Sequence, residues 1–174
     1  MLFVDADGLR DYMILRSKYN LMQEGMQSKE KYFVPPNQSL DDIPKDVENV
    51  YFCRYGNDAN WTVLDTSLFA QFRSITFGCG CFTNVRNFIL DGLEKLESLW
   101  IFEDSFCLPV QDSDDGDGIC WITNCHNLRQ LRIGPSCFRG FAQLEISNLN
   151  SLQSLIFDEE GFSHAEKCTF KGKS

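Results

Sequence analysis

Apolar and polar residues alternate in pairs of short segments from about residue 74 to the end of the chain. Alternation with a period of two is typical of a half-buried strand, because successive side chains point to opposite faces of a sheet. The pattern therefore predicts two short strands in each of four units. The residues expected to point inward from the first strands are Ile75 and Phe77, Leu99 and Ile101, Leu131 and Ile133, and Leu155 and Phe157; those from the second strands are Phe88 and Leu90, Cys120 and Ile122, Leu144 and Ile146, and Cys168 and Phe170.

A phenylalanine stands in the turn between the two strands of every unit: Phe82, Phe106, Phe138 and Phe162. These residues are separated by 24, 32 and 24 positions, and the longer interval reflects eight extra residues in the second unit. A fixed period of 20–50 residues marks stacked repeats, since one unit alone cannot bury its inward side chains. The sequence therefore predicts a continuous core made by stacked units.

The second strand of each unit is followed by glycine or asparagine, namely Gly92, Asn124, Asn148 and Gly172. These two residue types tolerate a positive φ angle, so we expect a tight corner at each position.

Upstream of the four units, residues 47–69 are expected to form a degenerate unit, with Val50 and Phe52 in one strand and residues 62–65 in the next. A helix is predicted over residues 5–31, because apolar side chains recur there at helical spacing. Pro35 and Pro36 would stop that helix. The expected organisation is an N-terminal helical cap and linker over residues 1–49, followed by the repeat domain over residues 50–174.

The first strands carry the pattern L-x-x-L-x-L, as Leu96, Leu99 and Ile101 show, and residues 50–172 thereby resemble the leucine-rich-repeat superfamily. The asparagine usual after that pattern is replaced in every unit, by Gly80, Asp104, Ser136 and Glu160 in turn. The units are therefore similar to the irregular BspA-like type, with about 24 residues each. That resemblance implies a β-rich α/β fold, a right-handed solenoid of about four to five units with a strand-lined face for protein recognition.

The amino-acid composition argues against some classes of binding partner. The chain has 43% apolar and 24% charged residues, a net charge of −9 and a pI of about 4.6. An acidic surface repels phosphate groups, so we expect neither nucleic acid nor a membrane as a partner. The N-terminus carries Asp5, Asp7 and Asp11 where a signal peptide would be apolar, and no apolar run approaches the ~18 residues of a spanning helix. We therefore expect a cytoplasmic protein.

Eight cysteines leave two interpretations open. Cys120, Cys125 and Cys168 fall at positions that apolar residues hold in other units, which favours reduced cysteines that fill the core. The alternative is a secreted or cell-surface structural or adhesion protein with disulfides, because an even cysteine count in a small chain is typical of that class.

No segment predicts catalysis or a cofactor. Asp112, Asp114, Asp115 and Asp117 form an acidic cluster, but Gly116 occupies the fifth ligand position of an EF-hand loop, and a solvated loop is expected instead. The pairs Cys79/Cys81 and Cys120/Cys125 lack the matched spacing of a structural zinc site. His126 and His164 are not placed beside an activated thiol by the pattern. We expect a protein that is not an enzyme and binds no metal.

The outward positions of the first strands are the expected binding surface. Trp100, Phe102, Arg132 and Ile156 stand out there, because exposed aromatic and branched apolar residues near an arginine are the composition of interface hot spots. Thr76 lies on the same face, and the corresponding row of the second strands, Ile89, Trp121, Glu145 and Thr169, is a weaker candidate. The sequence thus predicts a module that binds an unknown protein partner.

Overall fold

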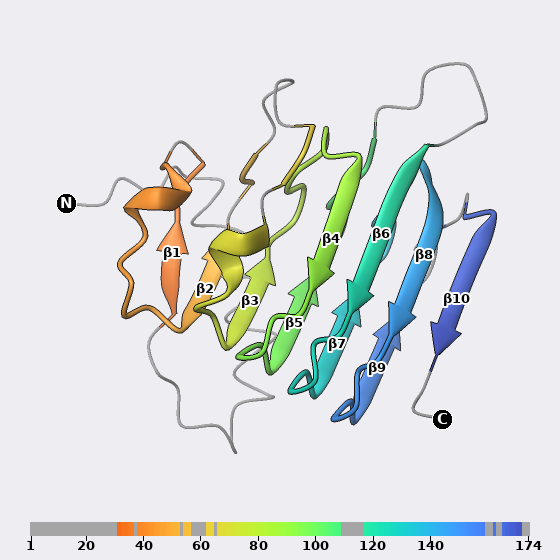
Figure 1. The fold of residues 1–174 in the computed structure, drawn as a ribbon. Helices are drawn as coiled ribbons and strands as arrows, with labels where there is room; N and C mark the ends of the chain where they lie inside the picture. The colour runs from red at the N-terminus through yellow and green to blue at the C-terminus, as the bar shows by residue number, and fades with distance from the viewer. Residues whose placement is uncertain are drawn as a thin grey trace.

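The part of the protein that the structure describes is built from two parallel β-sheets and has almost no helix (Figure 1). The computed structural model describes residues 31–36, 38–52, 54–56, 62–64, 66–108, 117–158, 162 and 165–171. Sheet A contains six strands in the order β1 (Tyr32–Val34), β2 (Asn49–Phe52), β3 (Ser74–Phe77), β5 (Ser98–Ile101), β7 (Gln130–Ile133) and β9 (Ser154–Phe157). Sheet B contains four strands in the order β4 (Asn87–Asp91), β6 (Gly118–Thr123), β8 (Phe141–Ser147) and β10 (Lys167–Lys171). Two short 3₁₀ helices, η1 (Leu40–Asp42) and η2 (Thr66–Phe69), complete the described elements.

From β3 onward the chain alternates between the two sheets, and each new strand pairs in parallel with the previous strand of its own sheet. Figure 1 shows the two layers with their strands running in opposite directions. The register equals the sequence period: Leu99 lies opposite Ile75 on one side and Leu131 on the other, and Leu131 lies opposite Leu155. The two predicted strands of each unit are therefore confirmed, as is their stacking in register.

The core lies between the sheets. The predicted inward residues of β3 to β8 are all buried, with at most 5% of their surface exposed. Burying large apolar side chains from both layers is the main stabilising contribution available to such short strands.

The turn phenylalanines stack into one column inside this core. The ring centroids of Phe82 and Phe106 are 5.4 Å apart, those of Phe106 and Phe138 5.0 Å, and those of Phe138 and Phe162 4.6 Å, with interplanar angles of 10°, 5° and 5°. Each phenylalanine has a φ angle of 55–57°, a region that bulky residues rarely adopt. The alternating pattern placed these residues in turns but did not predict this backbone conformation, which the stacking and burial of the rings compensate.

The predicted corners are confirmed where the structure describes them, since Gly92, Asn124 and Asn148 have φ angles of 67°, 56° and 56°. The asparagines also join neighbouring units: Asn148 Nδ2 donates to Asn124 Oδ1 at 2.8 Å, and Asn124 Nδ2 donates to Asp91 Oδ1 at 2.6 Å. Gly172 lies outside the described residues.

The N-terminal part differs from expectation. Tyr32–Val34, expected to belong to a linker, form strand β1 and pair with β2. Strand β2 confirms the first half of the degenerate unit, but its second half is reduced to an isolated bridge between Val63 and Asn87. The helix expected over residues 5–31 falls on residues that the structure does not describe, apart from Lys31.

The last unit also differs. Leu155, Phe157, Cys168 and Phe170 were expected in the core, yet all four are exposed. Their positions in the register are those predicted, but no further strand covers them within the described chain. No helix among the described residues is long and apolar enough to cross a membrane.

Candidate protein-interaction face

The outer side of sheet A carries one continuous row of side chains, which we call the sheet A row. The register places Tyr51 beside Thr76, Thr76 beside Trp100, Trp100 beside Arg132, and Arg132 beside Ile156. Neighbouring strands lie about 4.8 Å apart, so residues paired in this way are in lateral contact. Three of the four predicted binding residues, Trp100, Arg132 and Ile156, are thus brought together on adjacent strands, as Figure 1 allows the reader to follow along β5, β7 and β9.

Trp100 is half-buried, and a lysine lies over its ring. Lys31 Nζ is 5.7 Å from the ring centroid, a cation–π distance. The same ammonium group donates to Thr76 Oγ1 at 3.5 Å. Desolvation by burial lowers the pKa of Lys31.

The expectation that Thr76 is exposed is wrong, because only 2% of its surface is accessible. It faces outward as predicted, but Lys31, far away in the sequence, lies against it. The N-terminal half of the sheet A row is therefore covered, and the accessible half begins at Trp100.

Arg132 is held in place by an acidic residue that directly follows the next strand, β9. Its Nη2 donates to Asp158 Oδ2 at 2.8 Å and its Nε to the same oxygen at 3.3 Å, with about a third of each side chain exposed. A guanidinium fixed in this way presents its remaining donors in a defined direction.

Phe102 and Ile156 supply the apolar part of the face. Phe102 directly follows β5 and is half-buried, whereas Ile156 is 39% exposed. The equivalent positions beside Phe102 are glycines, Gly78 and Gly134, and a Cβ at Gly134 would lie 3.0 Å from the backbone nitrogen of Glu103. Neither neighbour of Phe102 in this column therefore carries a side chain.

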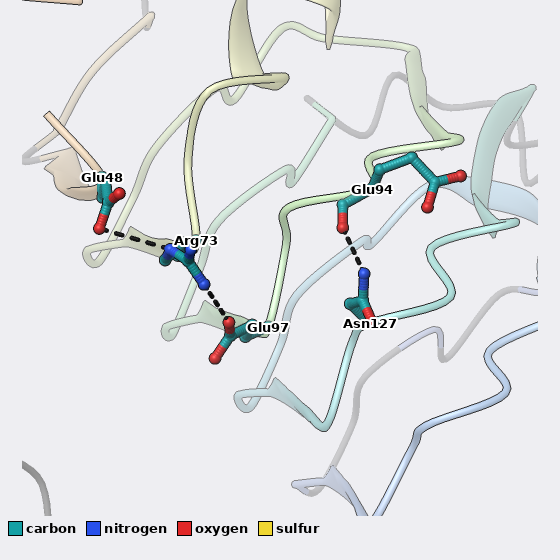
Figure 2. Close-up of polar contacts among 5 residues, drawn as sticks. All are labelled: Glu48, Arg73, Glu94, Glu97 and Asn127. Carbon is teal, nitrogen blue, oxygen red and sulfur yellow. Dashed lines mark hydrogen bonds and ion pairs between the residues drawn. The ribbon is translucent and has the colours of Figure 1, made fainter. Parts of the chain in front are cut away.

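A column of charged residues, which the alternating pattern did not predict, borders this face where the first strands begin. Arg73 Nη1 lies 2.6 Å from Glu97 Oε1, and Arg73 Nε lies 3.4 Å from Glu48 Oε2 (Figure 2). Beside it, Asn127 Nδ2 donates to the backbone oxygen of Glu94 at 2.6 Å. The signal was available, since Glu48, Arg73 and Glu97 each directly precede a first strand and alternate in sign.

The second candidate row lies on the outer side of sheet B, where Ile89, Trp121, Glu145 and Thr169 are paired in register as expected. All four side chains are half-buried. Glu145 accepts from Ser147 Oγ at 3.0 Å and lies 3.9 Å from Lys171 Nζ. This row offers no fixed cation at its centre.

The buried cysteines that the structure describes are thiols rather than disulfide bridges. Cys107, Cys120, Cys125 and Cys137 are buried and not disulfide-bonded, and Cys168 is exposed and also not bonded. Cys137 Sγ donates to the backbone oxygen of Phe102 at 2.9 Å, and Cys125 Sγ donates to that of Thr123 at 3.4 Å. Burial raises the pKa of Cys125 to about 11 and raises the pKa of Cys120 and Cys137 as well, so these sulfurs are poor nucleophiles.

The remaining polar candidates make structural contacts. His126 Nδ1 lies 3.1 Å from the backbone oxygen of Asn148 and 3.0 Å from Asn150 Nδ2. Of the acidic cluster, Asp117 alone is described, and it pairs with Arg86 at 2.5 Å; Asp112, Asp114 and Asp115, like His164, lie outside the described residues. Among the residues that the structure describes, no three His, Cys, Asp or Glu side chains are grouped to hold a metal ion.

Comparisons with known proteins give no relative: no family model matches the chain, and neither a curated protein nor a solved structure is significantly similar to it.

Proposed function

We propose that this chain is a non-enzymatic module that binds a protein partner on the outer face of sheet A. The contact would centre on Trp100, Phe102, Arg132 and Ile156. The observation that carries the proposal is the sheet A row, in which an aromatic, a fixed arginine and an exposed isoleucine are neighbours on β5, β7 and β9.

The chemistry of this row favours a protein as the ligand. Trp and Arg are enriched among the residues that dominate protein interfaces, and an arginine held by Asp158 loses little conformational entropy on binding. Neighbouring Phe102 adds a half-buried ring to the centre, while the Glu48–Arg73–Glu97 column supplies a polar rim.

We also propose that the two sheets are the two sides of a right-handed leucine-rich-repeat solenoid of the BspA-like type. Support comes from the equality of sequence period and strand register and from the repeated L-x-x-L-x-L pattern. Removal of residues 125–148, one whole unit, should then leave a folded and cooperatively unfolding protein. Removal of half that segment should not, because it would leave one sheet without the matching strand.

A pull-down with purified protein as bait tests the binding face. The double variant Trp100→Ala/Arg132→Ala should lose specific partners that the wild type retains. Trp121→Ala is the matched control, because it removes a half-buried tryptophan from the outer side of sheet B. Equal partner lists for wild type and double variant would overturn the proposed face, and loss only in the control would move the site to sheet B.

A thiol titration separates the proposal from the disulfide-bonded adhesion protein. The proposal includes a cytoplasmic protein with reduced cysteines, so the native protein denatured under argon should react with a thiol reagent at nearly all of its eight cysteines. A count near zero would support the adhesion alternative.

A further inference from the structure

A second surface lies at the end of the two sheets, where β9 and β10 form what we call the C-terminal edge. Within the described part of the chain, β9 pairs with β7 alone and β10 with β8 alone. Large exposed apolar side chains gather there: Leu155, Ile156, Phe157 and Phe170 are 40%, 39%, 38% and 53% exposed.

The edge is continuous across both layers. Phe157 from sheet A meets Phe170 from sheet B with ring centroids 5.9 Å apart, and Phe157 also meets the last ring of the phenylalanine column, Phe162, at 6.2 Å. The open strands and the open core layer therefore form one apolar surface. Open strand edges of this kind are templates for a further strand.

The charges on β10 determine which kind of strand can pair with it. The exposed Lys167 and Lys171 flank the inward pair Cys168 and Phe170 on β10. If β10 paired with β10 of a second copy in antiparallel register, centred on Thr169, Lys167 of each copy would lie opposite Lys171 of the other. Parallel pairing in register would place each lysine opposite itself. Like charges directly opposite one another are destabilising, and edge lysines are a known means of preventing self-association.

We propose that the C-terminal edge binds an extended acidic segment of a partner protein, which adds to sheet B beside β10. The segment that fits this edge has the residue order acidic–apolar–any–apolar–acidic. Its acidic side chains lie opposite Lys167 and Lys171, and its apolar side chains cover Cys168 and Phe170. Because this pattern is the same in both directions, parallel and antiparallel strands satisfy it equally.

A peptide titration of the full chain, followed by amide NMR, tests this proposal. The probe is a blocked peptide with the central sequence Glu-Val-Thr-Val-Glu, and two control peptides replace the glutamates by lysine or the central threonine by proline. We expect saturable shifts at the β10 amides with the first peptide alone, because proline removes a backbone donor and lysine repels Lys167 and Lys171.

Charge reversal supplies the decisive comparison. Lys167→Glu/Lys171→Glu should weaken binding of the glutamate peptide at least tenfold and create binding of the lysine peptide, because both charged positions of β10 are then reversed. Lys95→Glu is the matched control, since Lys95 is exposed but lies in the connection between β4 and β5, away from this edge, and it should change affinity less than twofold.

Three outcomes would overturn the proposal: no saturable shift at millimolar peptide, equal response to the glutamate and lysine peptides, or concentration-dependent self-association that protects β10. Trp100→Ala/Arg132→Ala should leave peptide binding unchanged. Failure of this proposal is therefore distinguishable from failure of the sheet A interaction face.

Discussion

Leu131 and Leu155 are the same residue type at the same position of adjacent strands, but their environments are opposite. Leu131 in β7 is 1% exposed, whereas Leu155 in β9 is 40% exposed. The two residues are direct partners in the register. The next inward position repeats the contrast, since Ile133 is fully buried and Phe157 is 38% exposed.

This difference shows that burial in this protein is supplied by the neighbouring unit rather than by the unit itself. Among the described strands, those inside each sheet, such as β7 and β8, pair with a strand on both sides, while β9 and β10 pair with a strand on one side. In stacked repeats, stability is approximately a sum of unit and interface contributions, so a unit with one interface should be the least stable.

The largest expected effect comes from the phenylalanine column. Phe106→Ala should lower the free energy of unfolding by about 3–5 kcal/mol, because its ring lies between Phe82 and Phe138. Phe162→Ala should cost about half as much, since the described residues stack on one face of that ring only. Both positions have a φ angle of 56°, so strain at the new alanine cancels in the comparison. Equal losses in urea unfolding would contradict the contrast between inner and terminal units.

The leucine pair gives the next effect. Leu131→Ala should destabilise the protein by about 2–5 kcal/mol through the cavity it leaves. Leu155→Ala should destabilise it by about 1 kcal/mol, because much of that side chain is already in water. Chemical denaturation of both variants measures the difference directly. A cost at Leu155 as large as that at Leu131 would mean that the C-terminal edge is covered in solution.

Alkaline pH should weaken the folded state through the buried cysteine Cys125. In the folded protein the pKa of Cys125 is raised to about 11, whereas in the unfolded chain a cysteine titrates near ~8.5. The stabilisation is thus fully present below about pH 8.5 and is lost as the pH rises toward 11.

For Cys125 this loss amounts to about 2 kcal/mol between pH 8 and 10. Urea unfolding under reducing conditions should show it in the wild type and show less of it in Cys125→Ala. Leu155→Ala is the control, because it removes an exposed apolar side chain and no cysteine, and it should keep the full pH dependence. If the free energy of unfolding of Cys125→Ala fell with pH as steeply as that of the wild type, the raised pKa of Cys125 would be contradicted.

The smallest effects are expected at the surface ion pairs. Arg132→Ala removes a half-buried pair with Asp158 between the last two strands of sheet A and should cost about 0.5–1 kcal/mol. Arg73→Ala breaks the exposed Glu48–Arg73–Glu97 column between inner strands and should leave the unfolding midpoint within error of the wild type. Unfolding at low and high salt measures both. A larger loss of stability in Arg73→Ala than in Arg132→Ala would show that the charged column, and not the core alone, stabilises the inner units.

The sequence predicted the strands and their register well, because alternation and a fixed period report directly on side-chain direction. Leu99 and Ile101 were placed inward and lie in the core, and Asn124 and Asn148 were placed at corners with positive φ. The candidate site was predicted as a set of outward positions, and the register brings Trp100, Arg132 and Ile156 together. Contacts from outside the period were missed: Lys31 against Thr76, and strand β1 beside β2.

The sequence by itself determined the two-layer alternation, since a residue's face in a strand depends only on whether its position is odd or even. The tertiary structure decided how much of each face meets water, because that depends on what lies beside the strand. It buried Thr76 under a lysine that lies 45 residues away in sequence, and it left Leu155, Phe157 and Phe170 exposed at an edge. It also forced four phenylalanines into a backbone conformation that only their stacked rings make tolerable. Periodicity is a local property of the chain, whereas burial is a property of the neighbours.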